Sequence, residues 1–358
     1  MIDGLDKVLE NSGHPGLPEL RGLLQELLGG RQANGCFIEQ QILQPRDLRV
    51  FRLRFVIKDE TRTLVVKRVK PEIARRNELV AKRWLPAIGL TDCGPPLLAS
   101  IAEPSGICVW HIYHDLGQHE LDCRHPDREG IRLAIEVIAR MHTRFAGHHL
   151  LGEVRLHGGD FGIHFFDSNV RDAIYAVTAC QPSAKQQDQL RDRLLTRLHK
   201  LRDELPQRAE ALEEYGGPET LLHGDLWTIN VFVVPTAHGL QVRLIDWEHA
   251  GVGPASYDLS TFLLRFSPPQ RPWIFDAYKQ QALLAGWHLP PAQELNLLFE
   301  TAEYARFANR VIWPAIALLQ DRASWGWDVL AEVDRWFEHL EPVLPREQHT
   351  STTCATPS

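Results

Sequence analysis

The sequence predicts an α+β fold of two lobes, with a small antiparallel-sheet lobe at the N-terminus and a larger, mainly helical lobe after it. Strand-like apolar runs dominate the N-terminal part of the chain, whereas from about residue 127 the apolar residues recur at helical spacing. The length of 358 residues is enough for two such lobes with a sizeable core. We therefore expect the N-terminal lobe at residues 1–114 and the helical lobe at residues 115–345.

The N-terminal lobe is expected to begin with a helix at about residues 18–28. Leucines form one apolar stripe along this segment, and Gly29 and Gly30 end it. Polar segments separate the strand-like runs that follow, so we expect an antiparallel meander. These runs are residues 36–43, 49–57 and 63–69.

A second helix and a further strand complete this lobe. Pro71 begins the helix at a position that proline favours, and Pro86 ends it. Residues 109–113 read as a short buried strand, and the joint between the lobes follows near residue 114.

The helical lobe is expected to begin with a buried helix at residues 128–146, because Ile131, Ile138 and Met141 fall on one helical face. A small hairpin interrupts the helices, and the polar end of the chain has the composition of a disordered tail. The further expected elements are charged helices over residues 181–215, the hairpin at residues 231–234 and 241–245, helices over residues 257–340, and the tail at residues 346–358.

Charge and composition limit the class of partner. The chain has 39 Lys and Arg against 46 Asp and Glu, which gives a formal net charge of −7. Nucleic acids and anionic membranes attract basic proteins, so we expect neither as a partner. An acidic surface suits a cationic ligand, although it commonly serves only solubility. A hydrophobic fraction of 44% is that of an ordinary globular protein.

The cysteines and the N-terminal segment indicate the compartment. Six cysteines are scattered without a C-x-x-C pair, a pattern typical of reduced thiols. The first residues are partly acidic and lack the apolar core of a signal peptide, and no apolar run approaches the roughly 18 residues of a membrane-spanning helix. We expect a cytoplasmic protein, either a monomer or a homodimer.

Three oxygen-bearing side chains, those of Asp225, Asn230 and Asp246, surround the expected hairpin. Asp246 follows its second strand and Asn230 precedes its first, so the hairpin is expected to make them neighbours. Amide and carboxylate oxygens are hard ligands that suit Mg²⁺ rather than zinc. Asp225, five residues before Asn230, can accept a proton from a hydroxyl, and base and metal together are what phosphoryl transfer requires. The alternative is that these residues only cap a loop and end a strand, but their joint occurrence around one hairpin favours the functional interpretation.

The two segments that carry these residues resemble a known family. Residues 223–230, H-G-D-L-W-T-I-N, are similar to the catalytic-loop motif of kinases, and residues 245–248, I-D-W-E, are similar to the D-F-G segment. Together they resemble the aminoglycoside phosphotransferase and choline kinase family, which has a bilobal protein-kinase-like fold. The resemblance implies that Asp225 is the catalytic base, and that Asn230 and Asp246 hold Mg²⁺ on the ATP phosphates.

The N-terminal lobe is consistent with the same resemblance. Lys67 ends the run V-V-K, similar to the kinase V-A-I-K, which implies that it contacts the α and β phosphates. Glu78 on the next helix is the expected partner of Lys67, ahead of Glu72, whose place in the first helical turn is explained by the helix dipole. The backbone carbonyl of Tyr113 and the backbone amide of Asp115 would bind the adenine.

A buried aspartate and two departures from the family complete the comparison. Asp258 resembles the aspartate that braces the catalytic loop in the family, with a plain helix N-cap as the alternative. Residues 44–48, where the family usually has glycine, contain none, which leaves weak nucleotide binding open. Gly224 stands where protein kinases have the arginine that pairs with an activation-loop phosphate, so a small-molecule kinase is favoured over a protein kinase.

The function that these features predict is ATP-dependent transfer of a phosphoryl group to a hydroxyl of a small molecule, with GTP as an alternative donor. An aminoglycoside-like antibiotic, an amino alcohol and a sugar all remain open as acceptors. Acids of the helical lobe are candidates for holding a cationic acceptor: Glu248, Glu300, Glu303, Asp328, Asp160 and Asp167.

Two other functions compete with this prediction. A pseudokinase-like binding module is motivated by the glycine-free loop, but it would need none of Lys67, Asp225, Asn230 and Asp246. A metal-dependent hydrolase would need several histidines or carboxylates on one metal, and His223 and Asp225 have no third candidate nearby.

Overall fold

The computed structural model describes residues 2–10, 12–30, 34–44, 48–125 and 127–345. The chain divides into two compact units. The first, the sheet unit, comprises Met1–Asp122, Leu156–Gly158 and Thr228–Ala250, and the second, the helical unit, comprises Cys123–Arg155, Gly159–Trp227 and Gly251–Ser358. The tail expected at residues 346–358 lies outside the described residues.

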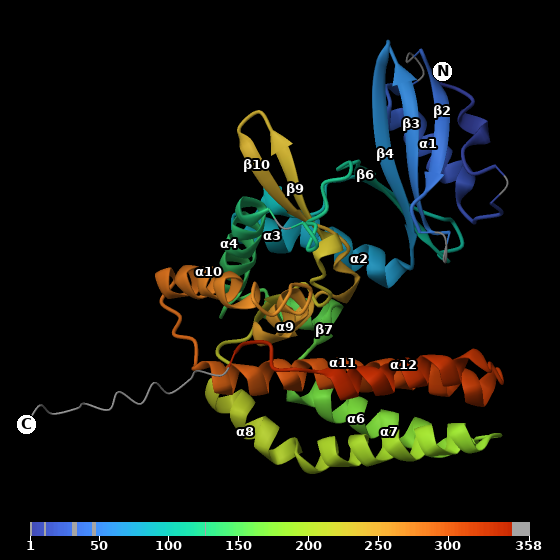
Figure 1. The fold of residues 1–358 in the computed structure, drawn as a ribbon. Coiled ribbons are helices and arrows are strands. Elements are labelled where there is room, and N and C mark those ends of the chain that lie inside the picture. The colour runs from blue at the N-terminus through green and yellow to red at the C-terminus, as the bar shows by residue number, and fades with distance from the viewer. Residues whose placement is uncertain (1, 11, 31–33, 45–47, 126, 346–358) are drawn as a thin grey trace, which may run out of the picture. The chain divides into compact units, whose positions relative to one another are not determined.

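The sheet unit contains a six-stranded sheet in the order β1-β2-β3-β4-β6-β5 (Figure 1). Its strands are β1 Ile2–Asp3, β2 Gly35–Ile42, β3 Val50–Ile57, β4 Glu60–Val69, β5 Leu97–Ala102 and β6 Val109–His114. The pairs from β2 to β5 are antiparallel, which confirms the predicted meander and the predicted strand at residues 109–113. The pairing of β1 with β2 is parallel and was not predicted.

One face of this sheet forms a core with helix α1, Leu17–Leu27. Leu20 and Leu24 of the helix belong to the same buried cluster as Val66 of β4 and Ile112 of β6. Because side chains alternate along a strand, the neighbours of these two strand residues, among them Lys67, face away from α1. Register places Lys67 opposite His111 on β6.

Helix α2, Pro71–Leu79, begins at the proline that predicts it. It continues through a π-helical turn, Val80–Trp84, into the short helix α3, Leu85–Ala87. Pro86 is the second residue of α3, a position near a helix start where proline is tolerated. The helix ends one residue after it.

The predicted hairpin is present as β9, Val231–Thr236, and β10, Gly239–Leu244. It belongs to the sheet unit, whereas the expected lobe boundary at residue 114 assigns it to the helical part. Its contacts explain the grouping, since the guanidinium of Arg243 donates to the carbonyl of Gly94 at 3.4 Å and the main chain of Leu121 pairs with Val231.

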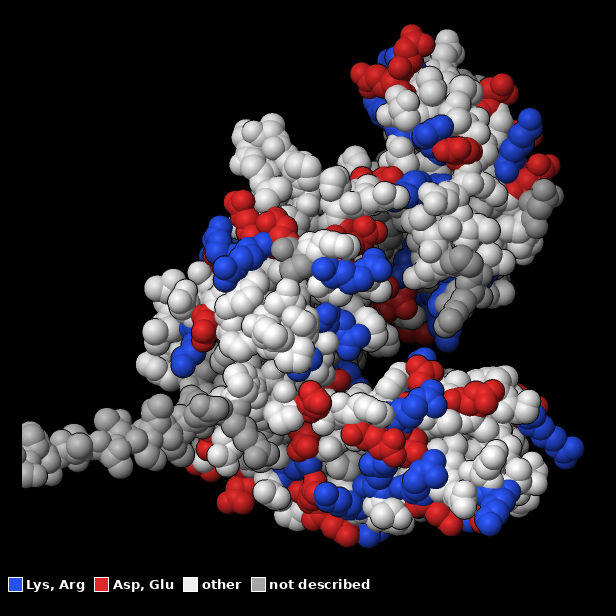
Figure 2. Space-filling view, viewed as in Figure 1, with Lys and Arg blue, Asp and Glu red and all other residues white. Residues whose placement is uncertain are grey.

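The helical unit is built around long antiparallel helices. Its core joins α6, α7, α11 and α12 through residues such as Phe166, Leu194, Val311 and Leu330. Figure 2 shows basic and acidic side chains interspersed on the outer face of α7 and α8, as expected for a solvated helical surface. The helices are α4 Arg128–Phe145, α6 Ile163–Ala179, α7 Lys185–Asp203, α8 Leu205–Tyr215, α9 Ser256–Leu263, α10 Arg271–Leu284, α11 Ala292–Gln320 and α12 Trp325–His339, with α5 Leu151–His157 shared between the two units.

A small sheet, in the order β7-β11-β8, lies within the helical unit. Its strands are β7 Gly159–Asp160, β8 Thr220–Leu222 and β11 Gly251–Gly253. The strand β8 leads directly into residues 223–230, so this sheet supports the start of the predicted catalytic loop. None of the helices in the described ranges has the length and apolarity needed to cross a lipid bilayer.

Candidate active site

In the sheet unit, two carboxylates converge on one lysine. The Nζ of Lys67 lies 2.6 Å from Oδ1 of Asp246 and 2.7 Å from Oε1 of Glu248. The lysine side chain is 12% exposed, so it is largely shielded from water. Burial by itself lowers the pKa of Lys67, but the charges of Asp246 and Glu248 outweigh it and raise the pKa above its ordinary value.

The position of Asp246 follows from the end of the hairpin. Its backbone has φ 64° and ψ 57°, a left-handed conformation that costs energy for a residue other than glycine. This conformation turns the chain from β10 into the short helix Trp247–His249. The amide of Ile245 donates to the carbonyl of Asn230 at 3.0 Å, so the hairpin brings both ends of the predicted metal site to one place.

The residues at this place fit a magnesium ion. Asn230 is buried and carries a side-chain amide oxygen, and the carboxylates of Asp246 and Glu248 converge on the ammonium group of Lys67. Such hard oxygen donors are the ligands that Mg²⁺ prefers. Over the described ranges of the chain, no group of three His, Cys, Asp or Glu side chains is arranged to hold a metal, so the fit rests on the mixed amide and carboxylate set.

The expected partner of Lys67, Glu78, makes other contacts. Its carboxylate lies 3.5 Å from Nζ of Lys82 and 3.7 Å from Nε2 of His111. The physical reason is that Lys67 is engaged by Asp246 and Glu248 after β10, which the position of Glu78 on the helix could not reveal. The guanidinium of Arg76 fixes α2 beside this segment, since it donates to the carbonyl of Glu248.

The two residues expected at the adenine lie at the end of β6. The hydroxyl of Tyr113 lies 2.8 Å from Nδ1 of His111, and burial, reinforced by Asp246 and other nearby acids, raises the pKa of this hydroxyl. The carboxylate of Asp115 is 2.7 Å from Nε of Arg52 and accepts from the amide of Gly117 at 3.0 Å. These side-chain contacts hold the end of β6 and the residues after it in a defined conformation. They do not involve the backbone carbonyl of Tyr113 or the backbone amide of Asp115, which are the groups expected to bind the adenine.

In the helical unit, Asp258 braces the start of the catalytic loop. Its carboxylate accepts hydrogen bonds from the amide of His223 at 2.7 Å and from the amide of Gly224 at 2.9 Å. Nε2 of His142 lies 3.3 Å away, and Asp258 is fully buried. Helix α9 begins two residues earlier with Ala255 at its N-cap, so the alternative of a plain helix cap is wrong.

The carboxyl group of Asp258 is held in its charged form. Burial alone would raise its pKa, but the hydrogen bond and charge of His142 and the contacts to His223 lower the pKa below the ordinary value. The amides of the catalytic loop therefore hydrogen bond to a carboxylate that is charged at neutral pH.

Asp225, the expected catalytic base, is half-buried and lies in a tight turn. The amide of Trp227 donates to the carbonyl of Asp225 at 2.8 Å. Two arginines that the sequence did not single out, Arg265 and Arg306, interact electrostatically with Asp225. Arg265 follows α9 by two residues and Arg306 lies within α11, and neither belongs to a motif, so no sequence signal distinguishes them.

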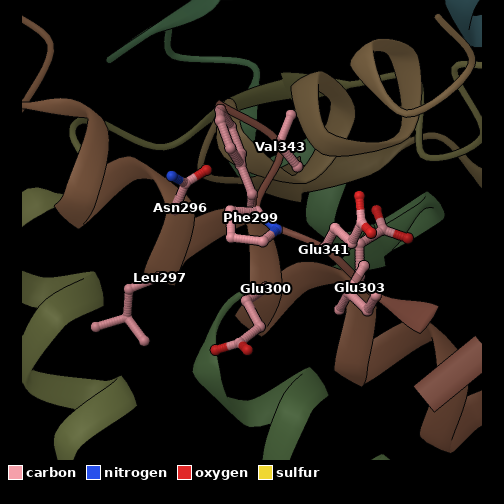
Figure 3. Close-up of a pocket in the computed structure, with 9 residues that line it drawn as sticks. Asn296, Leu297, Phe299, Glu300, Glu303, Glu341 and Val343 are labelled. Carbon is pink, nitrogen blue, oxygen red and sulfur yellow. The ribbon is translucent and has the colours of Figure 1, made fainter. Parts of the chain in front are cut away.

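An acidic cavity of about 180 Å³ opens between α11 and the segment after α12 (Figure 3). Glu300 and Glu303, both expected acceptor residues, line it together with Glu341. Glu303 is paired with Arg306 at 2.5 Å, and Glu300 with Arg208 at 3.0 Å. The other expected acids lie elsewhere, since Glu248 binds Lys67, Asp160 pairs with Arg155 at 2.8 Å, and Asp328 and Asp167 lie on α12 and α6.

The family model described as "Phosphotransferase enzyme family" matches residues 49–295. No curated protein sequence matches the chain.

Solved structures share the fold at low sequence identity. The spectinomycin phosphotransferase APH(9)-Ia, solved with ADP and spectinomycin, is 13% identical, with a TM-score of 0.54 over 90% of this chain and 95% of its own. APH(2")-IIia, solved with GDP and kanamycin, is 16% identical, with a TM-score of 0.54 over 84% and 94%. An ethanolamine kinase from Plasmodium vivax is 12% identical, with a TM-score of 0.52 over 84% and 81%. The chain therefore has the α+β kinase-like fold that the sequence predicts.

Proposed function

The chain belongs to the phosphotransferase enzyme family, and from that premise we propose that it is an ATP-dependent kinase that phosphorylates a hydroxyl of a small molecule. The observation that carries the proposal is the cluster of Lys67, Asp246 and Glu248, in which a buried lysine and two acids are gathered at the end of the hairpin. A phosphoryl-transfer site needs this combination of a cation for the phosphates and acids for a metal. GTP is the alternative donor.

In this reaction Asp225 orients the acceptor hydroxyl and takes its proton as the oxygen attacks the terminal phosphorus. The new bond forms between this oxygen and phosphorus, the bond to the bridging oxygen breaks, and ADP leaves with the bond electrons. Asn230 and Asp246 would hold Mg²⁺, which neutralises charge on the phosphates when bound. Lys67 binds the α and β phosphates, and the backbone carbonyl of Tyr113 and the backbone amide of Asp115 bind the adenine.

The acceptor that we propose is a hydroxylated small molecule of the size of an amino alcohol, a sugar or an aminoglycoside. The similar structures act on, or were solved with, acceptors of this kind, namely spectinomycin, kanamycin and ethanolamine. The cavity lined by Glu300, Glu303 and Glu341 supports a cationic group on such an acceptor. We propose neither a nucleic-acid nor a membrane partner for the chain.

A nucleotide-binding module of weak or absent activity is the second candidate. The observation that favours it is the glycine-free segment at residues 44–48, of which residues 45–47 lie outside the described structure. Retention of Asp225 and of the clustered acids favours the kinase.

Thermal unfolding with ATP, GTP and ADP, each with and without Mg²⁺, tests the nucleotide part. We expect a Mg²⁺-dependent rise in the melting temperature that Asp246→Asn abolishes and that a control variant at the exposed Asp192, Asp192→Asn, retains. Release of ADP in the presence of acceptors then tests catalysis. Asp225→Asn is expected to lower turnover by about 10²–10⁴-fold while the nucleotide shift persists.

The outcomes separate the candidates. Absence of any Mg²⁺-dependent shift contradicts the proposed kinase. A shift without ADP release for any acceptor, or turnover that Asp225→Asn leaves unchanged, favours the binding module.

A further inference from the structure

The guanidinium of Arg265 is aimed at the catalytic loop. Arg265 follows α9 by two residues, and its guanidinium carbon lies 4.0 Å from the centre of the Trp227 ring. Trp227 is itself two residues after Asp225 and hydrogen bonds to the Asp225 carbonyl. The stacking therefore holds a positive charge against the ring of Trp227, two residues from the expected catalytic base.

Part of this guanidinium lacks a partner. Its Nε is buried and has no hydrogen-bond acceptor within the described residues. A buried donor without a partner is costly, and a buried charge more so. Burial lowers the pKa of Arg265, and the charges of Glu303 and Asp225, which act in the opposite direction, do not outweigh it.

A second arginine, Arg306, acts electrostatically on Arg265 and has the contacts of a structural residue. Arg306 donates to Oε1 of Glu303 at 2.5 Å and to Oγ of Ser260 at 3.1 Å, and it also bonds to the carbonyl of Tyr257. Its guanidinium carbon lies 3.6 Å from the centre of the Tyr257 ring. Arg306 thus already neutralises Glu303, a task for which Arg265 is not needed.

We propose that Arg265 is a specificity-determining residue that binds a carboxylate or phosphate group of the acceptor. A planar guanidinium offers parallel donors that match either anion, and the Trp227 ring holds it in one orientation. The acceptor is then a hydroxylated anion or zwitterion. Its ammonium group, where present, faces the acidic cavity lined by Glu300, Glu303 and Glu341. This inference rests on the proposed kinase activity and narrows its acceptor class.

Matched acceptor pairs test the inference in the full-length protein. L-serine and ethanolamine, and L-homoserine and 3-aminopropanol, differ only in a carboxylate, whereas glycerol 3-phosphate and glycerol differ in a phosphate. We expect ADP release with at least about tenfold higher kcat/KM for the anionic member of a pair, as expected for a bidentate pair worth more than 1.4 kcal/mol. Preference among the first two pairs indicates a carboxylate, and preference in the third indicates a phosphate.

Arg265→Gln is expected to raise KM for the anionic acceptor at least tenfold and to change kcat little. For the member of each pair that lacks the carboxylate or phosphate, we expect KM and kcat to be unchanged. Arg265→Lys should restore only part of the loss, because lysine keeps the charge without the fork. The matched control is Arg128→Gln, since Arg128 is exposed and stacks on Trp273 at 4.7 Å in the same unit. Equal melting temperatures of the variants show that each is folded.

Three results would overturn the inference. The first is a preference for the member without the anion, and the second is a fall in kcat at unchanged KM in Arg265→Gln, which would indicate a role in the transition state. Where no member of the panel is phosphorylated, the rise in melting temperature with inorganic phosphate and with L-serine is measured instead. The third result is then an equal rise in melting temperature for Arg265→Gln and Arg128→Gln. The kinase proposal fails separately, by loss of the Mg²⁺-dependent nucleotide shift.

Discussion

The Nζ of Lys67 lies 2.6 Å from Oδ1 of Asp246, so a strand residue and the residue that ends the hairpin share one ion pair. Both are assigned to nucleotide chemistry by the proposed function, one to the phosphates and one to the metal. The pair neutralises both groups before any phosphate or metal is bound. Nucleotide and metal must then replace an existing interaction, which couples their binding.

Replacement of Lys67 tests this coupling. In Lys67→Met the acids Asp246 and Glu248 lose their shared cation, so we expect a loss of about 1–3 kcal/mol in the free energy of unfolding. We also expect Mg²⁺ alone to raise the melting temperature more in the variant than in the wild type, whereas ATP binding weakens. Lys82→Met, at a largely exposed lysine paired with Glu78, is the control. An unchanged response to Mg²⁺ would contradict the coupling.

Asp258 is expected to be the most sensitive polar position of the helical unit. Asp258→Ala leaves the amides of His223 and Gly224 buried without an acceptor, at a cost of about 3–5 kcal/mol measured by urea unfolding. Asp258→Asn keeps one acceptor oxygen and should cost less. Because the folded pKa of Asp258 is lowered, its contribution is complete above about pH 4 and is lost as the pH falls through the folded pKa. A loss in Asp258→Ala no larger than at an exposed aspartate would contradict the bracing role.

His111 predicts a distinct dependence of stability on pH. Burial, with the charges of Lys67 and Lys82, outweighs Glu78 and lowers the pKa of His111 from 6.5 to about 4. Between these values the unfolded state binds a proton that the folded state does not, so stability falls as the pH drops from 6.5 to 4. At about 1.4 kcal/mol per pKa unit, the loss is of the order of 3 kcal/mol.

Urea unfolding between pH 7 and pH 4 measures this effect. We expect His111→Gln to lack this part of the pH dependence, whereas His164→Gln, at an exposed histidine, retains it. Parallel pH profiles for the wild type and His111→Gln would show that the buried histidine does not titrate in this way.

The small sheet of the helical unit tolerates no side chain at Gly251. A Cβ added there would lie 2.4 Å from the carbonyl oxygen of Gly159, so the backbone of one strand must shift. We expect Gly251→Ala to lose about 1–3 kcal/mol of stability. Gly22 of α1 has no atom within 4 Å of an added Cβ, and Gly22→Ala should gain about 1 kcal/mol. Equal and small effects in thermal unfolding would contradict the packing at β11.

The elements that were predicted correctly are those that depend on local patterns. Alternating apolar residues gave the strands from β2 to β4, helical spacing gave α4, and the turn between two apolar runs gave the hairpin. The brace at Asp258 followed from the family resemblance and is confirmed by the contacts of its carboxylate. The catalytic and metal-binding roles of Asp225 and Asn230 stay predictions.

What was not predicted depends on which distant segments meet. The two-residue strand β1 is too short to show a pattern, and its parallel pairing depends on the path of the preceding chain. Glu248 was expected, as an acid, among the acceptor residues. Its position two residues after Asp246 does not show that it reaches Lys67, and only the fold reveals this contact. Arg265 has the sequence context of a surface arginine, and only the fold places it on the Trp227 ring.

The carboxylate of Asp258 also determines how the protein opens to solvent. The amide hydrogens of His223 and Gly224 point into a group carried by α9, so neither can exchange with deuterium until that helix moves away. These two amides should therefore exchange at the rate of the α9 interior rather than at the rate of a loop. The segment that holds the expected catalytic base is, in this respect, an extension of a buried helix.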